Sequence, residues 1–332
     1  MKPPGDAEHS PSPPRAASRP DLPSSVSIRE VGPRDGFQNE PETIATAEKV
    51  ELVNALARTG LPRIEVTSFV RAEVIPQLAD AEEVLLAVEI PSEVSVSVLI
   101  PNERGLERAL ALRERVRIDE INVFLSASET HNRRNVNRSV RESLVGAQTV
   151  LARAREAGLR CEGVVSTAFG CPYEGHVPPQ RVLEIAAALR DGGAQEIAFG
   201  DTTGMANPAQ VEGFFRTARE QLGGDVELTA HFHNTRGAAL ANVLGALHAG
   251  VASFESSFGE LGGCPVPPGS TGNLATEDLV SMLHEMDIHT GVDLAALLAC
   301  SRRAQEILGR PLGSHTLVAG PVDWGGGAGA VA

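Results

Sequence analysis

The chain has 332 residues, of which 42% are hydrophobic, and carries a formal net charge of −14 at pH 7. This charge argues against nucleic acid or an anionic membrane as a partner, because both require clustered Lys and Arg. Four cysteines in a chain of this length do not form a disulfide framework, and no apolar run is long enough to span a membrane. We therefore expect a reduced, cytoplasmic protein.

Both ends of the chain are predicted to be disordered. Residues 1–25 are rich in Pro, Ser and Ala and lack the apolar core of a secretory signal. They also carry acidic residues, which disfavours a transit peptide. The chain beyond residue 310 shows no further unit and ends in a run of small residues. The sequence predicts one domain over residues 26–310, between a leader and a C-terminal tail at 311–332.

Between these ends, short β-rich runs alternate with longer patterns of helical apolar spacing. The expected strands are 26–31, 63–69, 95–100, 118–126, 160–169, 195–201, 226–233 and 253–259. The expected helices are 46–60, 79–88, 103–114, 139–158, 178–191, 208–221, 237–250 and 275–286, with an extra helix at 293–308.

Such alternation predicts a parallel sheet covered by helices. Eight units match the closed (β/α)8 TIM barrel. A doubly wound open sheet is the alternative, but that fold usually has a Gly-rich dinucleotide loop after its first strand. The segment GPRDG (32–36) lacks that pattern. We predict an α/β fold, a TIM barrel with a C-terminal extra helix.

Polar side chains occur at the carboxyl ends of the predicted strands, where TIM-barrel active sites lie. Arg34 and Asp35 follow the first strand, and Asp201 ends the sixth. Glu65 stands between two aliphatic residues in the second strand, so it faces the lumen if they face the helices. A lumenal carboxylate is costly unless it is paired or bound to a cation. Each residue alone also fits a local ion pair, a turn or a helix cap.

His231 and His233 end the seventh strand, two residues apart and therefore on one face. Two imidazoles on one face at a barrel mouth are more often metal ligands than core residues. Asn273 follows the eighth strand. With Asp35, these residues offer carboxylate, amide and imidazole donors without thiolate, a set that suits Mg²⁺ or Mn²⁺ better than Zn²⁺.

Cys264 lies in the Gly- and Pro-rich segment GELGGCPVPPGSTGN (259–273). This composition predicts a long loop over the barrel mouth. A free cysteine is usually a buried structural thiol, but a position in a lid favours an acid/base or nucleophilic role. Cys171, after the fifth strand, is a second candidate near the site. Cys161 and Cys300 fall inside a strand and a helix, and we interpret them as structural.

Several segments resemble the bacterial type of 3-hydroxy-3-methylglutaryl-CoA (HMG-CoA) lyase, a family within the metal-dependent barrels that also include isopropylmalate, citramalate and homocitrate synthases. They are GPRDGFQNE (32–40), IEVTSFV (64–70), SETHN (128–132), FGCPYEG (169–175), GDTTG (200–204), HFHNTRGAALAN (231–242), LGGCP (261–265) and TGNLATEDLV (271–280). The Arg-Asp-Gly and His-x-His motifs are shared by the whole group, whereas GCPYEG and the cysteine loop are more specific to lyases. The resemblance extends from about residue 26 to about residue 308.

Transferred position by position, the resemblance implies roles for individual residues. The metal ligands for Mg²⁺ or Mn²⁺ would be Asp35, His231, His233 and Asn273. The catalytic residues would be Arg34, Glu65, Asp201, His231 and Cys264. The substrate contacts would be Arg34, Gln38, Ser68 and Thr202.

The implied reaction is the retro-Claisen cleavage of HMG-CoA to acetyl-CoA and acetoacetate, a step of leucine degradation and ketone-body formation. The metal would bind the substrate hydroxyl and distal carboxylate, and Arg34 would stabilise the enolate oxygen. We hypothesise that His231 is the base and Cys264 the acid that protonates C2. The expected partner is a small-molecule acyl-CoA, for whose phosphates Arg133 and Arg134 are candidate contacts. A homo-oligomer is an open expectation.

Three features depart from the mitochondrial-type lyases: Asn234, where Asp is expected, Thr203, and the PVPPG stretch (265–269). Cleavage of (R)-citramalyl-CoA to acetyl-CoA and pyruvate is therefore an alternative activity. A Claisen-condensing synthase is another, but it usually carries a regulatory domain, and we expect no room for one after about residue 310. A non-catalytic barrel would be expected to lack a metal ligand.

Overall fold

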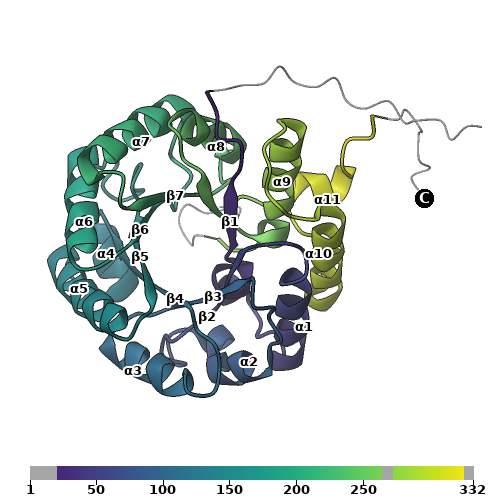
Figure 1. The fold of residues 1–332 in the computed structure, drawn as a ribbon, viewed down its shortest axis with the longest axis horizontal. Coiled ribbons are helices and arrows are strands. Elements are labelled where there is room, and N and C mark those ends of the chain that lie inside the picture. The colour runs from purple at the N-terminus through teal and green to yellow at the C-terminus, as the bar shows by residue number, and fades with distance from the viewer. Residues whose placement is uncertain (1–20, 264–271, 325–332) are drawn as a thin grey trace, which may run out of the picture.

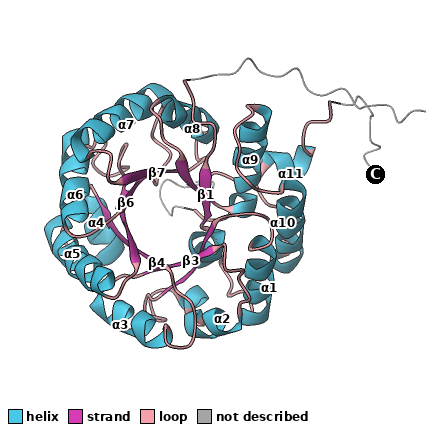
Figure 2. Ribbon diagram, in the orientation of Figure 1, coloured by secondary structure: helices cyan, strands magenta, loops and turns pink. Residues whose placement is uncertain are grey.

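The computed structural model describes residues 21–263 and 272–324 (Figure 1). Eight parallel strands close into a barrel in the order β1 to β8. Helices surround the strands on the outside (Figure 2). The predicted TIM barrel is confirmed.

The strands are β1 Ser27–Glu30, β2 Arg63–Ser68, β3 Ser95–Leu99, β4 Glu120–Ser126, β5 Arg160–Ser166, β6 Glu196–Asp201, β7 Glu227–Phe232 and β8 Ser253–Ser256. The helices are α1 Thr46–Leu56, α2 Ala81–Ala87, α3 Glu103–Leu112, α4 Glu129–Val136, α5 Val140–Glu156, α6 Pro179–Asp191, α7 Pro208–Leu222, α8 Ala239–His248, α9 Thr276–Glu285, α10 Leu294–Leu308 and α11 His315–Ala319. Each predicted strand and helix is present, and α4 and α11 are additional.

Helix α4 is short and polar, so it lacks the apolar period from which the longer helices are predicted. Ser128 begins it, because the Ser128 hydroxyl accepts a hydrogen bond of 3.1 Å from the amide of His131. Asn137, with a φ of 54°, ends it in the left-handed conformation. The helix follows β4 directly and therefore lies near the carboxyl ends of the strands.

Pairing of β1 with β8 closes the barrel, with Ser27 opposite Ser253 and Arg29 opposite Glu255. Because all strands are parallel, their carboxyl ends meet at one end, which we call the mouth, and their amino ends meet at the other, which we call the floor. Alternate side chains along each strand point into the lumen. The residues at these inward-pointing positions therefore decide where the lumen is polar.

The floor holds a buried ionic cluster, which we call the floor network. Its members are Arg29, Arg63, Glu120, Glu162, Glu196 and Glu255. The Arg29 guanidinium lies 2.8 Å from Glu120 and 3.0 Å from Glu255, and it also pairs with Glu162. Polar residues in the lumen are thus not confined to the mouth, and position alone does not distinguish a functional charge from a structural one.

The described residues form regular structure slightly beyond the predicted domain at both ends. Ser25 forms a parallel bridge with His289, one residue before the predicted boundary. In the segment predicted as a tail, Ser314 caps the amino end of α11, and its hydroxyl donates to Asp278 at 2.9 Å. The described part of the chain contains no helix that is long and apolar enough to cross a membrane.

Candidate active site at the barrel mouth

Arg34 and Asp35 lie in a single π-helical turn, Gly32–Gly36, that follows β1. Such turns are often found at functional sites. The turn packs tightly against the chain after β8, because a Cβ atom on Gly32 would lie only 2.5 Å from Cδ1 of Phe258. Glycine is therefore needed for this close approach, which brings Asp35 beside the end of β7.

The four predicted metal ligands meet at this point. One ligand atom from each of Asp35, His231 and His233 lies within 4.8 Å of the other two. The Nε2 atoms of the two histidines face each other at 3.1 Å. The backbones of His233 and Asn273 pair in an isolated antiparallel β-bridge. The side-chain amide of Asn273 donates a hydrogen bond to Asp35 Oδ2 at 2.7 Å.

This donor set fits a divalent cation. The buried Oδ1 atom of Asn273 has no hydrogen-bond partner in the described structure. Burial opposes ionisation of Asp35, but Arg34 and the two histidines outweigh it and lower its pKa to about 2. Burial and the neighbouring His231 lower the pKa of His233 to about 3, so this ring is neutral at pH 7. Asp35, His233 and Asn273 therefore present lone pairs, as a metal site requires.

His231 has a further partner that was not predicted. Its Nδ1 atom lies 2.9 Å from Oε2 of Glu255 in β8. Burial lowers the pKa of His231, but the Glu255 carboxylate outweighs this effect, and the pKa is raised overall. Glu255 pairs directly with His231 in the register of β7 and β8. A lumenal carboxylate in the eighth strand is the only sequence signal of this contact.

Arg34 lies between two carboxylates, 2.7 Å from Asp35 Oδ1 and 2.9 Å from Glu65 Oε2. Glu65 is fully buried, faces the lumen as predicted, and accepts a hydrogen bond from Asn122 at 2.6 Å. Burial opposes the charge on Arg34, but Glu65 and Asp35 outweigh it, so the pKa of Arg34 is raised. Arg34 is therefore a fixed cation beside the four predicted metal ligands Asp35, His231, His233 and Asn273, which we call the metal-ligand group.

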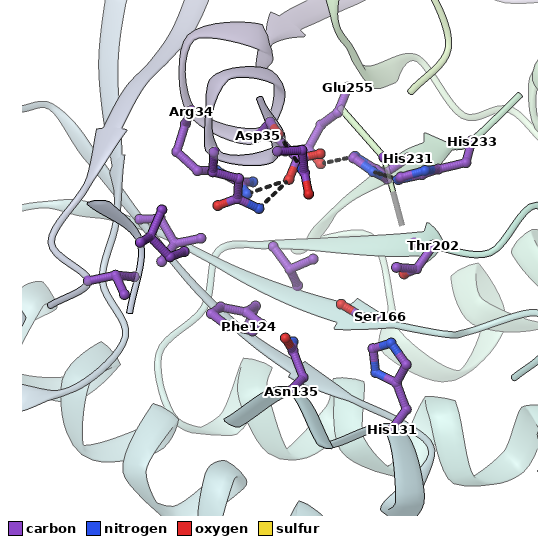
Figure 3. A pocket seen from close by; sticks show the side chains of 18 of the residues that line it. Arg34, Asp35, Phe124, His131, Asn135, Ser166, Thr202, His231, His233 and Glu255 are labelled. Carbon is purple, nitrogen blue, oxygen red and sulfur yellow. Dashed lines mark hydrogen bonds and ion pairs between the residues drawn. The ribbon is translucent and has the colours of Figure 1, made fainter. Parts of the chain in front are cut away.

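Arg34, Asp35, His231 and His233 line one side of a cavity of about 300 Å³, a volume typical of small-molecule sites. Figure 3 shows Arg34, Asp35 and the two histidines on one side of it, with His131 opposite. The cavity is also lined by Gln38, Val70, Ile75, Leu99, Phe124, Arg134, Asn135, Val164, Ser166, Tyr173 and Thr202. Of the predicted substrate contacts, Arg34, Gln38 and Thr202 thus line the cavity.

Four of the predicted site residues that the structure describes do not line it: Glu65, Ser68, Asp201 and Asn273. Ser68 is buried, with 1% of its surface exposed. Asp201 accepts hydrogen bonds from the amides of Met205, at 2.8 Å, and Ala206, at 3.2 Å. It thus stabilises the turn after β6, which was the structural alternative for this residue. Burial, only partly offset by these bonds, raises its pKa to about 7.

Three of the four cysteines lie in the described residues, and all three are buried free thiols. Burial raises the pKa of Cys161 and Cys300 to about 12, which agrees with a structural role. Cys171 does not line the cavity, and its sulfur lies 3.0 Å from the Ser128 hydroxyl. Cys264 lies outside the described residues.

Helix α4 contributes the opposite wall of the cavity. His131, Arg134 and Asn135 are three and four residues apart and share one helix face. The Arg134 guanidinium lies 4.1 Å from the centre of the Tyr173 ring, whereas Arg133 pairs on the surface with Glu129. Both arginines are predicted coenzyme A contacts, and only Arg134 lines the cavity.

Comparisons with known proteins identify the family. A family model described as HMGL-like matches residues 25–303. The chain is 48% identical to a hydroxymethylglutaryl-CoA lyase of Bacillus subtilis over 89% of this chain and 97% of that protein. It is also 40% identical to an (R)-citramalyl-CoA lyase of Chloroflexus aurantiacus over 90% of this chain and 96% of that protein.

Solved structures agree. The HMG-CoA lyase of Bacillus subtilis superimposes with a TM-score of 0.86 at 47% identity, over 90% of this chain and 98% of that chain. An HMG-CoA lyase from Acinetobacter baumannii in complex with coenzyme A and 3-methylmalate gives a TM-score of 0.85 at 38% identity, over 92% of this chain and 97% of that chain. The chain belongs to the HMGL-like family of barrel enzymes. Within that family it is a carbon–carbon lyase of the HMG-CoA lyase type.

Proposed function

We propose that this enzyme cleaves HMG-CoA to acetyl-CoA and acetoacetate with Mg²⁺ or Mn²⁺ as cofactor. The observation that carries the proposal is the convergence of Asp35, His231 and His233 beside the Arg34 cation. The names of the relatives support the choice of substrate. In this role the enzyme would act in the cytoplasm, in leucine degradation and ketone-body formation.

The cation would be held by Asp35, His231, His233 and Asn273, whose oxygen and imidazole donors suit Mg²⁺ or Mn²⁺. When bound, it supplies Lewis-acid polarisation of the substrate hydroxyl and distal carboxylate. The remaining requirements of the reaction fall to the protein side chains.

Arg34 would stabilise the negative charge that develops on the thioester oxygen. When the C2–C3 bond breaks, its electron pair moves toward that oxygen and forms an enolate. The two carboxylates that hold Arg34, Asp35 and Glu65, fix the guanidinium before substrate binds. A donor that is already oriented needs no reorganisation in the transition state.

The hydroxyl proton must leave and C2 must gain a proton. We assign the second step to Cys264. His231 is the base for the first step only where its Nε2 atom does not ligate the cation. The Nδ1 atom of His231 is engaged by Glu255, so Nε2 is its only nitrogen able to accept a proton. This atom faces His233 and the metal-ligand group, so metal binding and base catalysis by His231 compete for one lone pair. If Cys264→Ser left the cleavage rate unchanged, the thiol would not be the acid.

The coenzyme A portion would run along α4. Arg134 offers a cation at the cavity wall, and cations bind phosphate oxygens through charge-assisted hydrogen bonds. His131 adds a buried Nδ1 atom that has no hydrogen-bond partner in the described structure. The relative from Acinetobacter baumannii, crystallised with coenzyme A, supports an acyl-CoA substrate.

(R)-Citramalyl-CoA is the second candidate substrate, favoured by the similarity to the Chloroflexus enzyme. It has one methylene less than HMG-CoA between the carbinol carbon and the carboxylate. Asn234, the departure that suggested it, donates to Glu260 at 3.1 Å and does not line the cavity. This departure therefore gives no direct reason to prefer the shorter acid.

The test is a cleavage assay of the purified enzyme with each acyl-CoA, with Mg²⁺ and after treatment with EDTA. We expect metal-dependent release of acetyl-CoA, with kcat/KM for HMG-CoA higher by about 10-fold or more, because one methylene changes specificity by roughly 10–200-fold. Preference for citramalyl-CoA would replace the proposed substrate. Absence of cleavage, or full activity in EDTA, would contradict the proposal.

A further inference from the structure

Glu255 connects the two polar ends of the lumen. Its Oε2 atom lies 2.9 Å from Nδ1 of His231 at the mouth. Its Oε1 atom accepts a hydrogen bond of 3.0 Å from Nη1 of Arg29 in the floor network. Figure 3 shows the carboxylate beside the His231 ring, joined to it by a dashed line. Both carboxylate oxygens are thus engaged, one by each end.

The surroundings of Glu255 restrict it to one orientation. Its side chain is 3% exposed, and that of Arg29 is 1% exposed. Arg29 is in turn held by Glu120, Glu162 and Glu196. A carboxylate that accepts from a fixed guanidinium on one side has one oxygen left for the imidazole. The Glu255 carboxylate therefore offers His231 a hydrogen-bond acceptor at a fixed position.

We propose that Glu255 is a positioning residue for the metal centre. Held by Arg29, it accepts a hydrogen bond from Nδ1–H of His231 and so directs the Nε2 lone pair toward Asp35 and His233. A neutral imidazole carries one proton, and the partner of one nitrogen decides which nitrogen is left free. Carboxylate partners of this kind orient metal-bound histidines in general. The inference rests on the proposed metal site.

The alternative is that Glu255 only balances the charge of Arg29. Glu120 provides a matched control, because it is also buried and lies 2.8 Å from Arg29 but has no contact with His231. In Glu255→Gln the new amide nitrogen can take one of two places. It faces Arg29, where two hydrogen-bond donors oppose each other, or it faces Nδ1 of His231 and donates to it. The second arrangement moves the imidazole proton to Nε2, where it blocks the metal. Glu120→Gln removes the same charge beside Arg29 without this effect.

The first measurement needs no variant and no metal. Two-dimensional ¹H–¹⁵N NMR of histidine-labelled enzyme, in alkaline buffer where the rings are neutral, reports which nitrogen of His231 carries the proton. The resonance is assigned by its loss in His231→Gln. We expect the proton on Nδ1. A proton on Nε2 would overturn the inference, whatever the variants do.

The second measurement is Mn²⁺ affinity, by titration calorimetry, of the wild type, Glu255→Gln and Glu120→Gln. We expect Glu255→Gln to bind Mn²⁺ about 10–100-fold more weakly than the wild type, the usual cost of losing a residue that orients a metal ligand. Glu120→Gln should bind Mn²⁺ within about 3-fold of the wild type. Circular dichroism checks that each variant is folded. Equal affinities would overturn the inference. If the wild type bound Mn²⁺ but cleaved no acyl-CoA, the proposed function would fail while this result still decided the role of Glu255. If the wild type bound no Mn²⁺, the positioning role would fall with the metal site.

Discussion

The mouth and the floor of the barrel are both polar and buried, but their charges are arranged differently. At the floor, Arg29 and Arg63 face carboxylates at hydrogen-bond distance. At the mouth, Asp35 and two histidines bring lone pairs toward a common point. The carboxylates of the floor thus have guanidinium partners, whereas the donors at the mouth converge on a point where a cation would stabilise them.

This difference implies that changes at the mouth impair catalysis and that changes at the floor reduce stability. A change at Glu255, which contacts both ends, should also weaken metal binding. We expect the largest effect from Asp35→Asn, which removes the charged metal ligand. Loss of an outer-shell partner alone lowers activity by about 10–100-fold, so kcat/KM for HMG-CoA should fall by on the order of 1000-fold. Steady-state assays at saturating Mg²⁺ measure this, and a fall of less than about 10-fold would show that Asp35 is not a ligand.

Arg34→Met should lower kcat by about 100–1000-fold, the range observed when one donor to a developing oxyanion is removed. Because Arg34 is not a metal ligand, Mn²⁺ should still bind. Arg34→Lys keeps the charge but loses the two-sided contact with Asp35 and Glu65, so it should be intermediate. Single-turnover kinetics separate these effects from product release. Equal kcat in Arg34→Met and the wild type would contradict the assigned role.

Arg29→Met tests the floor. It leaves buried carboxylates without their cation, and loss of one partner from a buried pair reduces the free energy of unfolding by about 3–5 kcal/mol. The matched control is Arg108→Met, whose pair with Glu82 is exposed and should contribute at most about 1 kcal/mol. Urea denaturation measures both. Similar small losses in the two variants would show that the floor network does not stabilise the fold.

The pH dependence of metal binding gives a smaller, graded effect. The pKa of His231 is raised above its usual 6.5, so the metal-free ring is protonated at and below that pH. Metal binding must then displace a proton, and Mn²⁺ affinity should rise by up to about 10-fold per pH unit until pH exceeds this pKa. Asp35 and His233 lose their protons near pH 2 and 3 and do not contribute in this range. Affinity that is independent of pH between 5 and 7 would contradict a protonated His231.

The smallest expected effect is at the coenzyme A wall. Arg134→Ala should raise KM for HMG-CoA by about 3–10-fold with kcat nearly unchanged, because a contact to the remote part of the substrate is worth about 1 kcal/mol. Arg133→Ala is the control, since Arg133 pairs on the surface with Glu129. A free pantetheine thioester should show no difference between Arg134→Ala and wild type. Equal KM values in the two arginine variants would remove Arg134 from the binding site.

The apolar periodicity of the sequence sufficed to predict the barrel, because each strand and each long helix carries its own pattern. The convergence of Asp35, His231 and His233 was also predictable, since the carboxyl ends of all strands meet at one end. Helix α4 was not, because its polar sequence has no apolar period. The role of Glu255 depends on the register of β7 against β8, which the pattern of a single strand does not determine. The same holds for Asp201, whose turn amides are visible only once the chain is folded.

The central claim is that the lone pairs at the mouth hold a catalytic cation. The most direct test is the rate of HMG-CoA cleavage by EDTA-treated enzyme as Mg²⁺ or Mn²⁺ is added back, for the wild type and Asp35→Asn. We predict that the treated wild type is inactive, that activity returns in a saturable way with added metal, and that Asp35→Asn does not recover. Full activity without metal, or equal recovery of the variant, would contradict the claim.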